Sequence, residues 1–257
     1  MSGFEQAFED TEKAASAAVV SAGALVKLAR KVQKAAQQGR IGDVKRAQRD
    51  LAAAGSDLRQ AVANVVEAWP FGEEDEEQYF KEHYARELRY AAEELGLAIC
   101  EQDGKLISYP SIVRVLPARR AITIGGKQVS AIRPGYVARL LLDSRNKPVP
   151  HKSDAFLEAL YRVYSDIEQG EVGRVVPLAR IYKLFTSLPG AGREYDTTDF
   201  GRDLYLLDVS GPRRTKKGCA ISFHASSGTR GRSGLFSFVG PDGQEIRYYG
   251  IRFAQSE

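Results

Sequence analysis

The sequence predicts an α+β protein in which a long helical hairpin is followed by a small antiparallel β-meander and then by a mixed region of helices and strands. Three observations support this prediction. Apolar residues recur at alternating steps of three and four through the N-terminal region, as they do in paired helices. From Leu97, short segments rich in Ile and Val are separated by Gly and Pro. From Ser153, helical spacing returns before further strand-like segments. We therefore expect domains at residues 1–70, 71–147 and 151–257.

The first domain is expected to form two helices joined by a short turn. The segment Gln38–Gly42 contains two glycines, so it predicts the turn, and Asp43 is the expected N-cap of the second helix. The expected seam of the first helix is Phe8, Thr11, Ala15, Ala18, Ala22, Leu25, Ala29, Val32 and Ala36. The expected seam of the second helix is Val44, Ala47, Leu51, Ala54, Leu58, Ala61, Val65 and Ala68. Small alanines let the helix axes approach closely, which favours an antiparallel pair that serves as a brace, in self-association or in docking a protein partner.

The second domain is expected to contain a helix, five strands and a closing helix. The acidic run Glu73–Glu77 favours a helix start, because carboxylates stabilise the positive end of the helix dipole, and we expect this helix to reach about Leu95. The expected strands are Leu97–Glu101, Lys105–Tyr109, Ile112–Leu116, Ala121–Ile124 and Lys127–Ile132. The Gly125-Gly126 pair predicts a tight turn between the last two strands. A helix over Pro134–Asn146 and a linker over Lys147–Pro150 complete the domain.

The third domain is expected to begin with short helices and to end with strands. The expected helices are Ser153–Glu168, Pro177–Phe185 and Thr198–Val209, with Thr198 as the N-cap of the third helix. A short strand is expected at Arg174–Val176, before the second helix. The later strands are expected at Cys219–Ala225, Leu235–Val239 and Ile246–Phe253, with the first two paired as a hairpin across Ser226–Gly234.

The order of helix, short strand, helix, helix and a hairpin with a basic tip resembles the winged helix-turn-helix superfamily over residues 153–253. The resemblance lies in this element order and in the Gly-, Arg- and Ser-rich tip. It implies binding to double-stranded DNA, with the third helix in the major groove and the tip along phosphates or in the minor groove. The residues that would then contact DNA are Thr198 and Arg202 on the third helix and Arg230 and Arg232 in the tip.

The third helix also carries three acidic residues, Asp199, Asp203 and Asp208, and a single basic residue, Arg202. DNA phosphates repel carboxylates, so we expect non-specific binding led by the tip rather than base reading by this helix. Winged-helix folds also bind proteins. The alternative is therefore an adaptor or assembly subunit of a larger DNA-acting complex.

Charge is unevenly distributed, and two windows, Gly104–Leu142 and Val209–Pro241, contain no Asp or Glu. Residues 1–100 hold 13 bases and 17 acids, whereas residues 101–257 hold 24 bases and 16 acids. A window that keeps its bases and lacks acids favours binding to a polyanion, and the second window coincides with the predicted tip. Further candidate phosphate contacts in these windows are Arg213, Arg214, Lys216 and Lys217 before the strand at Cys219, and Arg119 and Arg120 at a corner of the meander.

Catalysis finds little support in the sequence. The histidines His83, His151 and His224 lack companions at metal-ligand spacing. Glu101 and Asp103 stand too close together to supply acids from two strands to a Mg²⁺-dependent nuclease, which stays a minor alternative. The two cysteines lack metal-ligand spacing and suit a reducing compartment, and no apolar run is long enough for a membrane helix. We expect a cytoplasmic, non-enzymatic DNA-binding protein with no catalytic residue, cofactor, metal site or membrane contact.

Overall fold

The computed structural model describes residues 3–147, 153–187, 195–224 and 234–255. These residues form helices and small antiparallel sheets, which confirms the α+β class. The chain divides into two compact units, of which the first contains residues 1–88, 117–120 and 131–137 and the second contains residues 89–116, 121–130 and 138–257. None of the described helices combines the length and the apolar character that crossing a bilayer requires.

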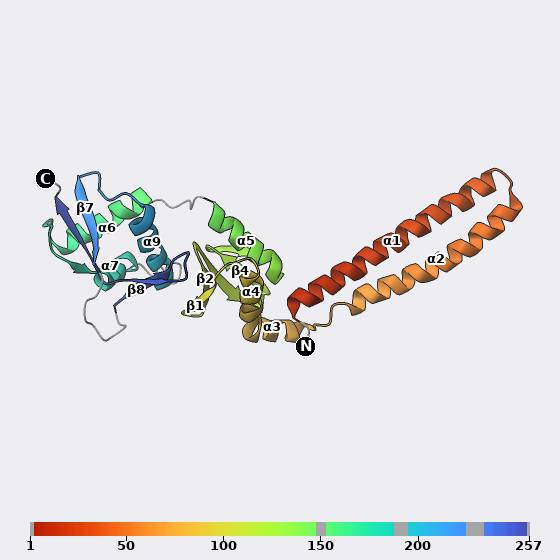
Figure 1. Cartoon of the computed structure of the whole chain (residues 1–257), viewed down its shortest axis with the longest axis horizontal. Helices are drawn as coiled ribbons and strands as arrows, with labels where there is room; N and C mark the ends of the chain where they lie inside the picture. The colour runs from red at the N-terminus through yellow and green to blue at the C-terminus, as the bar shows by residue number, and fades with distance from the viewer. Residues whose placement is uncertain (1–2, 148–152, 188–194, 225–233, 256–257) are drawn as a thin grey trace. The chain divides into compact units, whose positions relative to one another are not determined.

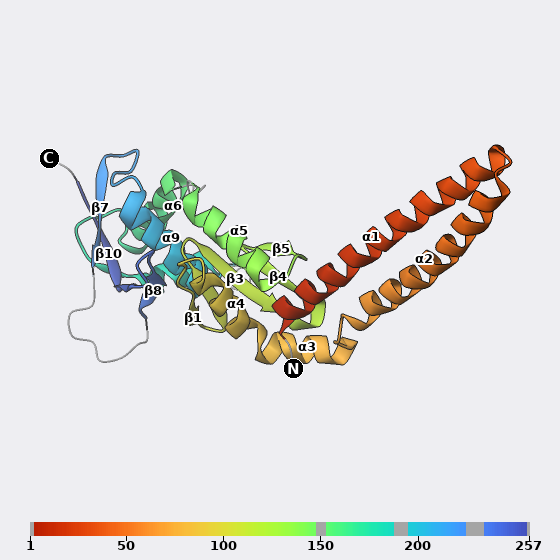
Figure 2. The same ribbon diagram turned by 45° about the vertical axis from the view of Figure 1, so that its right-hand side comes forward.

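The first unit contains the predicted hairpin, in which α1 (Phe4–Gln37) and α2 (Ile41–Glu67) run antiparallel and side by side in both ribbon views (Figures 1 and 2). Every predicted seam residue of α2 is at least partly buried. The α1 seam follows the prediction except at Ala29 and Ala36, which are exposed, and Ala35 is buried in place of Ala36. The predicted N-cap of α2 is wrong, because the helix begins two residues before Asp43 and Arg40 occupies the cap position.

An aromatic cluster holds the open end of this hairpin. The ring of Phe4 is fully buried and has ring neighbours 4.4 to 6.3 Å away, namely Phe8, Trp69, Phe71, Tyr79, Phe80 and Tyr84. The carboxylate of Glu87 accepts hydrogen bonds from the backbone N–H groups of Phe4 at 3.0 Å and of Glu5 at 2.8 Å. A carboxylate that is distant in sequence therefore satisfies the N-terminal donors of α1, which has no cap from its own side chains.

The single helix predicted from Glu73 to Leu95 is wrong, because the chain forms α3 (Glu73–Glu82) and α4 (Tyr84–Glu93). His83 separates them with a φ of −124°, outside the helical range. Buried aromatic side chains lie on both sides of this break, and Tyr84 donates a hydrogen bond to the carbonyl oxygen of Ile132 at 2.8 Å. The burial of these rings on both sides of His83 accompanies the break between α3 and α4.

The second unit contains the predicted meander as a five-stranded antiparallel sheet in sequence order. Its strands are β1 (Cys100–Gln102), β2 (Lys105–Ser108), β3 (Ser111–Leu116), β4 (Ala121–Ile124) and β5 (Lys127–Val129). The short 3-10 helix η1 (Pro117–Arg119) lies between β3 and β4. The next helix, α5 (Pro134–Asn146), begins and ends at the predicted residues. The predicted linker continues from Lys147 into residues that lie outside the described part of the chain.

The C-terminal region contains short helices followed by strands. Its helices are α6 (Ser153–Ile167), α7 (Leu178–Phe185) and α9 (Thr197–Ser210). Its strands are β6 (Val176–Pro177), β7 (Cys219–His224), β8 (Phe236–Val239), β9 (Glu245–Tyr248) and β10 (Gly250–Gln255). They form two antiparallel sheets, one with the order β6-β10-β7 and one in which β8 pairs with β9.

The predicted pairing of the strand after Cys219 with the strand near Leu235 is wrong. β7 pairs with β10, and β8 pairs with β9. The predicted strand over Ile246–Phe253 is also divided, because Tyr249 separates β9, in one sheet, from β10, in the other. The N–H of Tyr249 donates to the carbonyl of His224 at 3.0 Å, and its carbonyl accepts from the N–H of Leu178 at 2.8 Å. These two hydrogen bonds hold Tyr249 at the point where the chain passes from one sheet to the other.

One hydrophobic core unites the elements of the second unit. Phe200, Leu204 and Leu207 of α9 are fully buried in it, together with residues of α6, α7 and the C-terminal strands. Ile107 and Ile112 of the meander belong to the same cluster. This packing places β2 and β3 close to α9, and α9 carries part of the predicted DNA contact.

Candidate nucleic-acid interface

The helix α9 is largely enclosed within the second unit. Its buried residues are Thr198, Asp199, Phe200, Gly201, Leu204, Tyr205, Leu206 and Leu207. The predicted N-cap is wrong, because the helix begins earlier and Asp196 is its cap. One carboxylate oxygen of Asp196 accepts hydrogen bonds from the N–H groups of Thr198 at 3.0 Å and Asp199 at 3.2 Å. Asp is among the preferred residues for this position.

The strand β8 covers one side of α9. A Cβ atom added to Gly201 would lie 2.5 Å from the carbonyl oxygen of Ser237, so the helix and the strand approach each other as closely as glycine permits. The ring centroids of Phe200 and Phe236 are 4.9 Å apart. A duplex cannot reach this side of the helix while β8 is packed on it.

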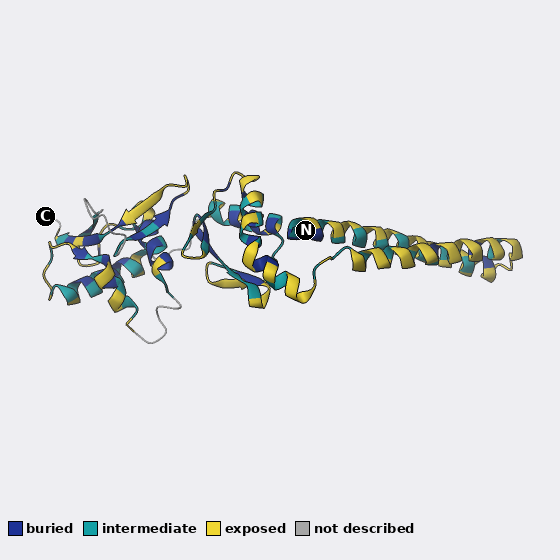
Figure 3. Cartoon of the chain, turned by 90° about the horizontal axis from the view of Figure 1, so that it is seen from below, coloured by how far each residue is buried: buried dark blue, intermediate teal, exposed yellow. Residues whose placement is uncertain are grey.

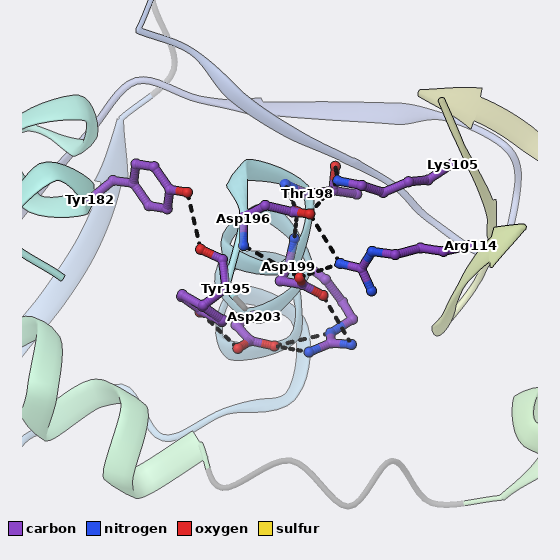
Figure 4. A network of polar contacts seen from close by, with 9 residues as sticks. Lys105, Arg114, Tyr182, Tyr195, Asp196, Thr198, Asp199 and Asp203 are labelled. Carbon is purple, nitrogen blue, oxygen red and sulfur yellow. Dashed lines mark hydrogen bonds and ion pairs between the residues drawn. The ribbon is translucent and has the colours of Figure 1, made fainter. Parts of the chain in front are cut away.

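Two basic side chains from the meander cover the N-terminal end of α9 (Figure 4). The Nζ of Lys105 lies 2.5 Å from Asp196 Oδ2 and 2.9 Å from Thr198 Oγ1. The Nη2 of Arg114 lies 3.0 Å from Asp196 Oδ2 and 2.6 Å from Asp199 Oδ2. Asp199, one of the three acids that made a DNA contact by this helix doubtful, is thus neutralised within the protein together with the N-cap Asp196.

The sheet register explains why both bases reach the same place. Leu106 of β2 pairs with Val113 of β3, so Lys105 and Arg114 occupy the next pair of positions on these adjacent strands. Cross-strand neighbours point to the same side of a sheet. Two bases from this edge of the meander therefore converge on one helix end.

The charges in this cluster shift each other's ionisation. Burial alone would raise the pKa of Asp196, but hydrogen bonds from Lys105 and Arg114 outweigh burial and lower this pKa to about 2. Burial alone would lower the pKa of Arg114, but Asp196 and Asp199 outweigh it and raise this pKa. Removing one member would leave a partly buried charge without its partner, which is destabilising.

Arg202, a predicted DNA contact, is also engaged inside the protein. Its Nη2 lies 3.0 Å from Asp203 Oδ1, and its side chain is 22% exposed. The hydroxyl of Tyr195 donates to the other oxygen of Asp203 at 2.8 Å, and burial together with this carboxylate raises the pKa of Tyr195. Because Thr198 is fully buried as well, the predicted entry of this helix into a major groove does not fit its packing.

The predicted basic loop before β7 folds as a tight hairpin with that strand. The N–H of Thr215 donates to the carbonyl of Cys219 at 2.9 Å, and the N–H of Gly218 donates to the carbonyl of Thr215 at 2.9 Å. Gly218 has a φ of 81°, which favours glycine. A three-residue loop that ends in such a residue is a common hairpin connection, and it exposes Lys216 and Lys217 at its corner.

The bases of this basic hairpin (residues 213–221) differ in their contacts. Arg213 lies 2.9 Å from a carboxylate oxygen of Asp208, which ties the hairpin to the end of α9 and engages Arg213. Arg214, Lys216 and Lys217 are exposed, and no ion pair joins them to an acid within the described residues. These three side chains are the predicted contacts that stay open to a phosphate.

One further basic residue, Arg252, was not predicted as a contact and lies on the same face as Arg214. Arg214 forms a bridge with Ala220, and Arg252 on β10 pairs with Ser222 on β7. Cross-strand partners and alternate residues of a strand point to the same side, so Arg214 and Arg252 share the open face of the β6-β10-β7 sheet. The sequence does contain a signal for this, because Arg252 is flanked by apolar residues whose alternation predicts that it points outward.

Two further predicted contacts, Arg119 and Arg120, belong to the first unit. Arg120 lies 2.9 Å from a carboxylate oxygen of Glu76 in the first unit, where Arg119 is exposed beside it. Arg230 and Arg232 lie outside the described residues.

Comparison with family models, with curated proteins and with solved structures finds no match for this chain. The candidate interface therefore depends on the geometry of the chain itself. In the part of the chain that the structure describes, no group of three or more His, Cys, Asp and Glu residues is arranged to hold a metal ion.

Proposed function

We propose that this chain is a non-enzymatic DNA-binding protein that holds the phosphates of a duplex through its C-terminal sheet and its basic hairpin. The observation that supports this proposal most is that Arg214, Lys216 and Lys217, just before β7, and Arg252, on the neighbouring β10, are all exposed, with no ion pair to an acid among the described residues. From Cys219, beside the hairpin corner, to Ser222, the partner of Arg252, β7 advances about 10 Å, at about 3.4 Å per residue. Each DNA strand places one phosphate per about 3.4 Å of helix axis, so several phosphates fall within this distance.

The proposed architecture of the C-terminal region is winged-helix-like. Among the described residues, three helices and one short strand are followed by further strands, and the last strand, β10, lies between β6 and β7 in the sheet. Because α9 is enclosed, the proposed contact comes from the sheet, from the basic hairpin and from Arg230 and Arg232, which follow β7 in the sequence. Such contacts reach phosphates rather than base edges, so we expect binding without sequence preference.

The salt dependence of duplex binding tests this proposal. The variant carries three changes, Arg214→Gln, Lys216→Gln and Lys217→Gln. Each phosphate contact contributes about 0.9 to the slope of log K against log salt, so the variant should lose about 2.7 units of slope and bind more weakly. Fluorescence anisotropy with a labelled duplex, titrated at several salt concentrations, measures both quantities.

A matched control removes three charges from other exposed positions of the second unit, with Lys127→Gln, Arg180→Gln and Lys183→Gln. This control has the same net charge as the test variant, so it should keep most of the parent slope. No binding by the parent, or equal slopes for both variants, would refute the proposed interface.

The enclosure of α9 favours a second candidate, an adaptor subunit that docks proteins through its winged-helix-like region. A protein complex of this kind should survive about 0.5 M salt, which screens charges beyond a few ångströms. Co-purification from the native host at this salt concentration would recover a stoichiometric partner. Recovery of the chain alone would count against the adaptor.

A further inference from the structure

The hairpin of α1 and α2 has a middle section with few charges. Residues 14–26 of α1 contain no Asp, Glu, Lys or Arg, and residues 51–66 of α2 contain only Asp57 and Arg59, which cancel each other. Helices that are apolar on all sides are normally buried. Here the two helices bury the seam between them, while Figure 3 shows exposed residues along the outer faces of both.

Four exposed valines lie on one side of this middle section. Val19 is 72% exposed, Val26 is 50%, Val62 is 50% and Val66 is 74%. Each follows a seam residue of its own helix by one position. Because the two helices are antiparallel, positions that follow the seam by one lie on the same side of the hairpin in both. We call this surface the valine face.

Gly23 lies between Val19 and Val26 on the valine face. A Cβ atom added to it would meet no other atom within 4 Å, so nothing in the described chain requires glycine there. Glycine inside a helix is unfavourable relative to alanine. A position without a side chain lets another helix approach closely, which is the use of glycine where two helix backbones meet.

The two ends of the hairpin carry opposite charge. Residues 27–50, at the tip, contain eight bases and two acids. Residues 4–13 and Glu67, at the open end, contain one base and five acids. A second copy turned end for end would place its basic tip beside the acidic end and its neutral middle against the neutral middle. The arrangement with both tips together would place like charges side by side, which is unfavourable.

We propose that the valine face binds the same face of a second copy of this chain in antiparallel orientation, which forms a four-helix bundle around a two-fold axis near Gly23. The same patch then serves both copies, as in most symmetric dimers. Burial of the valines favours association, glycine permits close approach and the charged ends set the orientation. This interface is separate from the proposed DNA contact and does not depend on it.

Sedimentation of the full chain tests the proposed dimer. The parent should sediment at twice its mass of 28.3 kDa at micromolar concentration. The double variant Val19→Glu with Val66→Glu should be monomeric, with a dissociation constant raised on the order of a hundredfold or more, because an unpaired charge would be buried at the interface. Both positions are exposed within one chain, so far-UV circular dichroism should stay unchanged.

A matched control makes the same change at exposed valines of the second unit, Val175→Glu with Val209→Glu. This control should stay dimeric. A monomeric parent, or a dimeric Val19→Glu with Val66→Glu variant, would overturn the proposal.

Cysteine cross-linking tests the orientation. The Gly23→Cys chain should form a covalent dimer under mild oxidation, because the two copies meet near the axis. Chains with Gly42→Cys should cross-link to chains with Asp10→Cys but not to each other, with the parent as the control for the native thiols. Self-cross-linking of Gly42→Cys, at the tip, would show parallel hairpins and would overturn the antiparallel arrangement.

Discussion

Replacing Asp196 with Asn would measure how much the ion cluster at the start of α9 contributes to stability. Asn keeps a side-chain oxygen that can accept the same backbone N–H groups, so the helix stays capped. It loses the negative charge that Lys105 and Arg114 neutralise. The substitution therefore separates electrostatics from capping.

The magnitude follows from the pKa of this carboxyl, which is about 2 in the folded protein against an ordinary value of 3.8. At about 1.4 kcal/mol per pKa unit, the full shift corresponds to about 2.4 kcal/mol. The side chain of Asp196 is 22% exposed, and solvent screening reduces the contribution to about 1–2 kcal/mol. The folded pKa lies below the unfolded one, so this stability is present above about pH 5 and is lost as the pH falls through 4 toward 2.

Urea unfolding at pH 7 and at pH 2.5 provides the assay. The only tryptophan, Trp69, lies in the first unit, so its fluorescence follows that unit, whereas far-UV circular dichroism follows both. Between these pH values we expect the parent to lose about 1–2 kcal/mol more than Asp196→Asn. The difference should appear in circular dichroism and not in tryptophan fluorescence.

A control variant, Asp166→Asn, removes an exposed acid of α6 and should keep the pH dependence of the parent. Equal pH dependence in the parent and in Asp196→Asn would refute the reasoning, because it would mean that Lys105 and Arg114 do not lower the pKa of this carboxyl. A difference that appears in tryptophan fluorescence would place the acid-sensitive contact in the first unit instead.

Two further predictions concern close packing and capping. Gly201→Ala should lose about 1–3 kcal/mol in urea unfolding, because its Cβ would lie 2.5 Å from the Ser237 carbonyl oxygen, while Gly42→Ala, with nothing within 4 Å, should lose nothing. Glu87→Gln should lower the stability of the first unit by about 1–2 kcal/mol, because the N–H groups that begin α1 lose a charged acceptor. Tryptophan fluorescence would detect this loss, and an unchanged midpoint would contradict it.

Local periodicity was sufficient to predict several elements of the fold. The α2 seam from Val44 to Ala68 is at least partly buried at every predicted position, since a three-four spacing places those residues on one side of a helix. The strands of the meander lie at the predicted places, and β4 has the predicted bounds, whereas β1, β2 and β5 are shorter than predicted and β3 is one residue longer. The bounds of α5 match because Pro134 and the polar residues after Asn146 mark both ends in the sequence.

Pairings between distant segments could not be predicted in this way. β7 pairs with β10, and β8 and β9 lie between them in sequence, so local alternation favoured the nearer strand. The contact between Arg114 and Asp196 joins residues 82 positions apart. The sequence indicates that the acids of α9 would be repelled by DNA phosphates. It does not indicate their partners, because only the tertiary fold brings β3 to this helix.

The two acid-free windows are explained by different physics. In the first window, Lys105 and Arg114 pair with acids of α9, and Arg133 pairs with Glu5 and Glu12 of α1. These three bases lack acids nearby in sequence because their acids come from other segments, so this part of the window reflects internal neutralisation.

In the second window, Arg213 has a partner of the same kind in Asp208, whereas Arg214, Lys216 and Lys217 are exposed without one in the described part of the chain. Exposed bases without an ion-pair partner create a positive potential, which neutralised bases do not. The argument for a nucleic-acid partner therefore depends on these three residues and Arg252, and it would hold even if every base in the first window were removed.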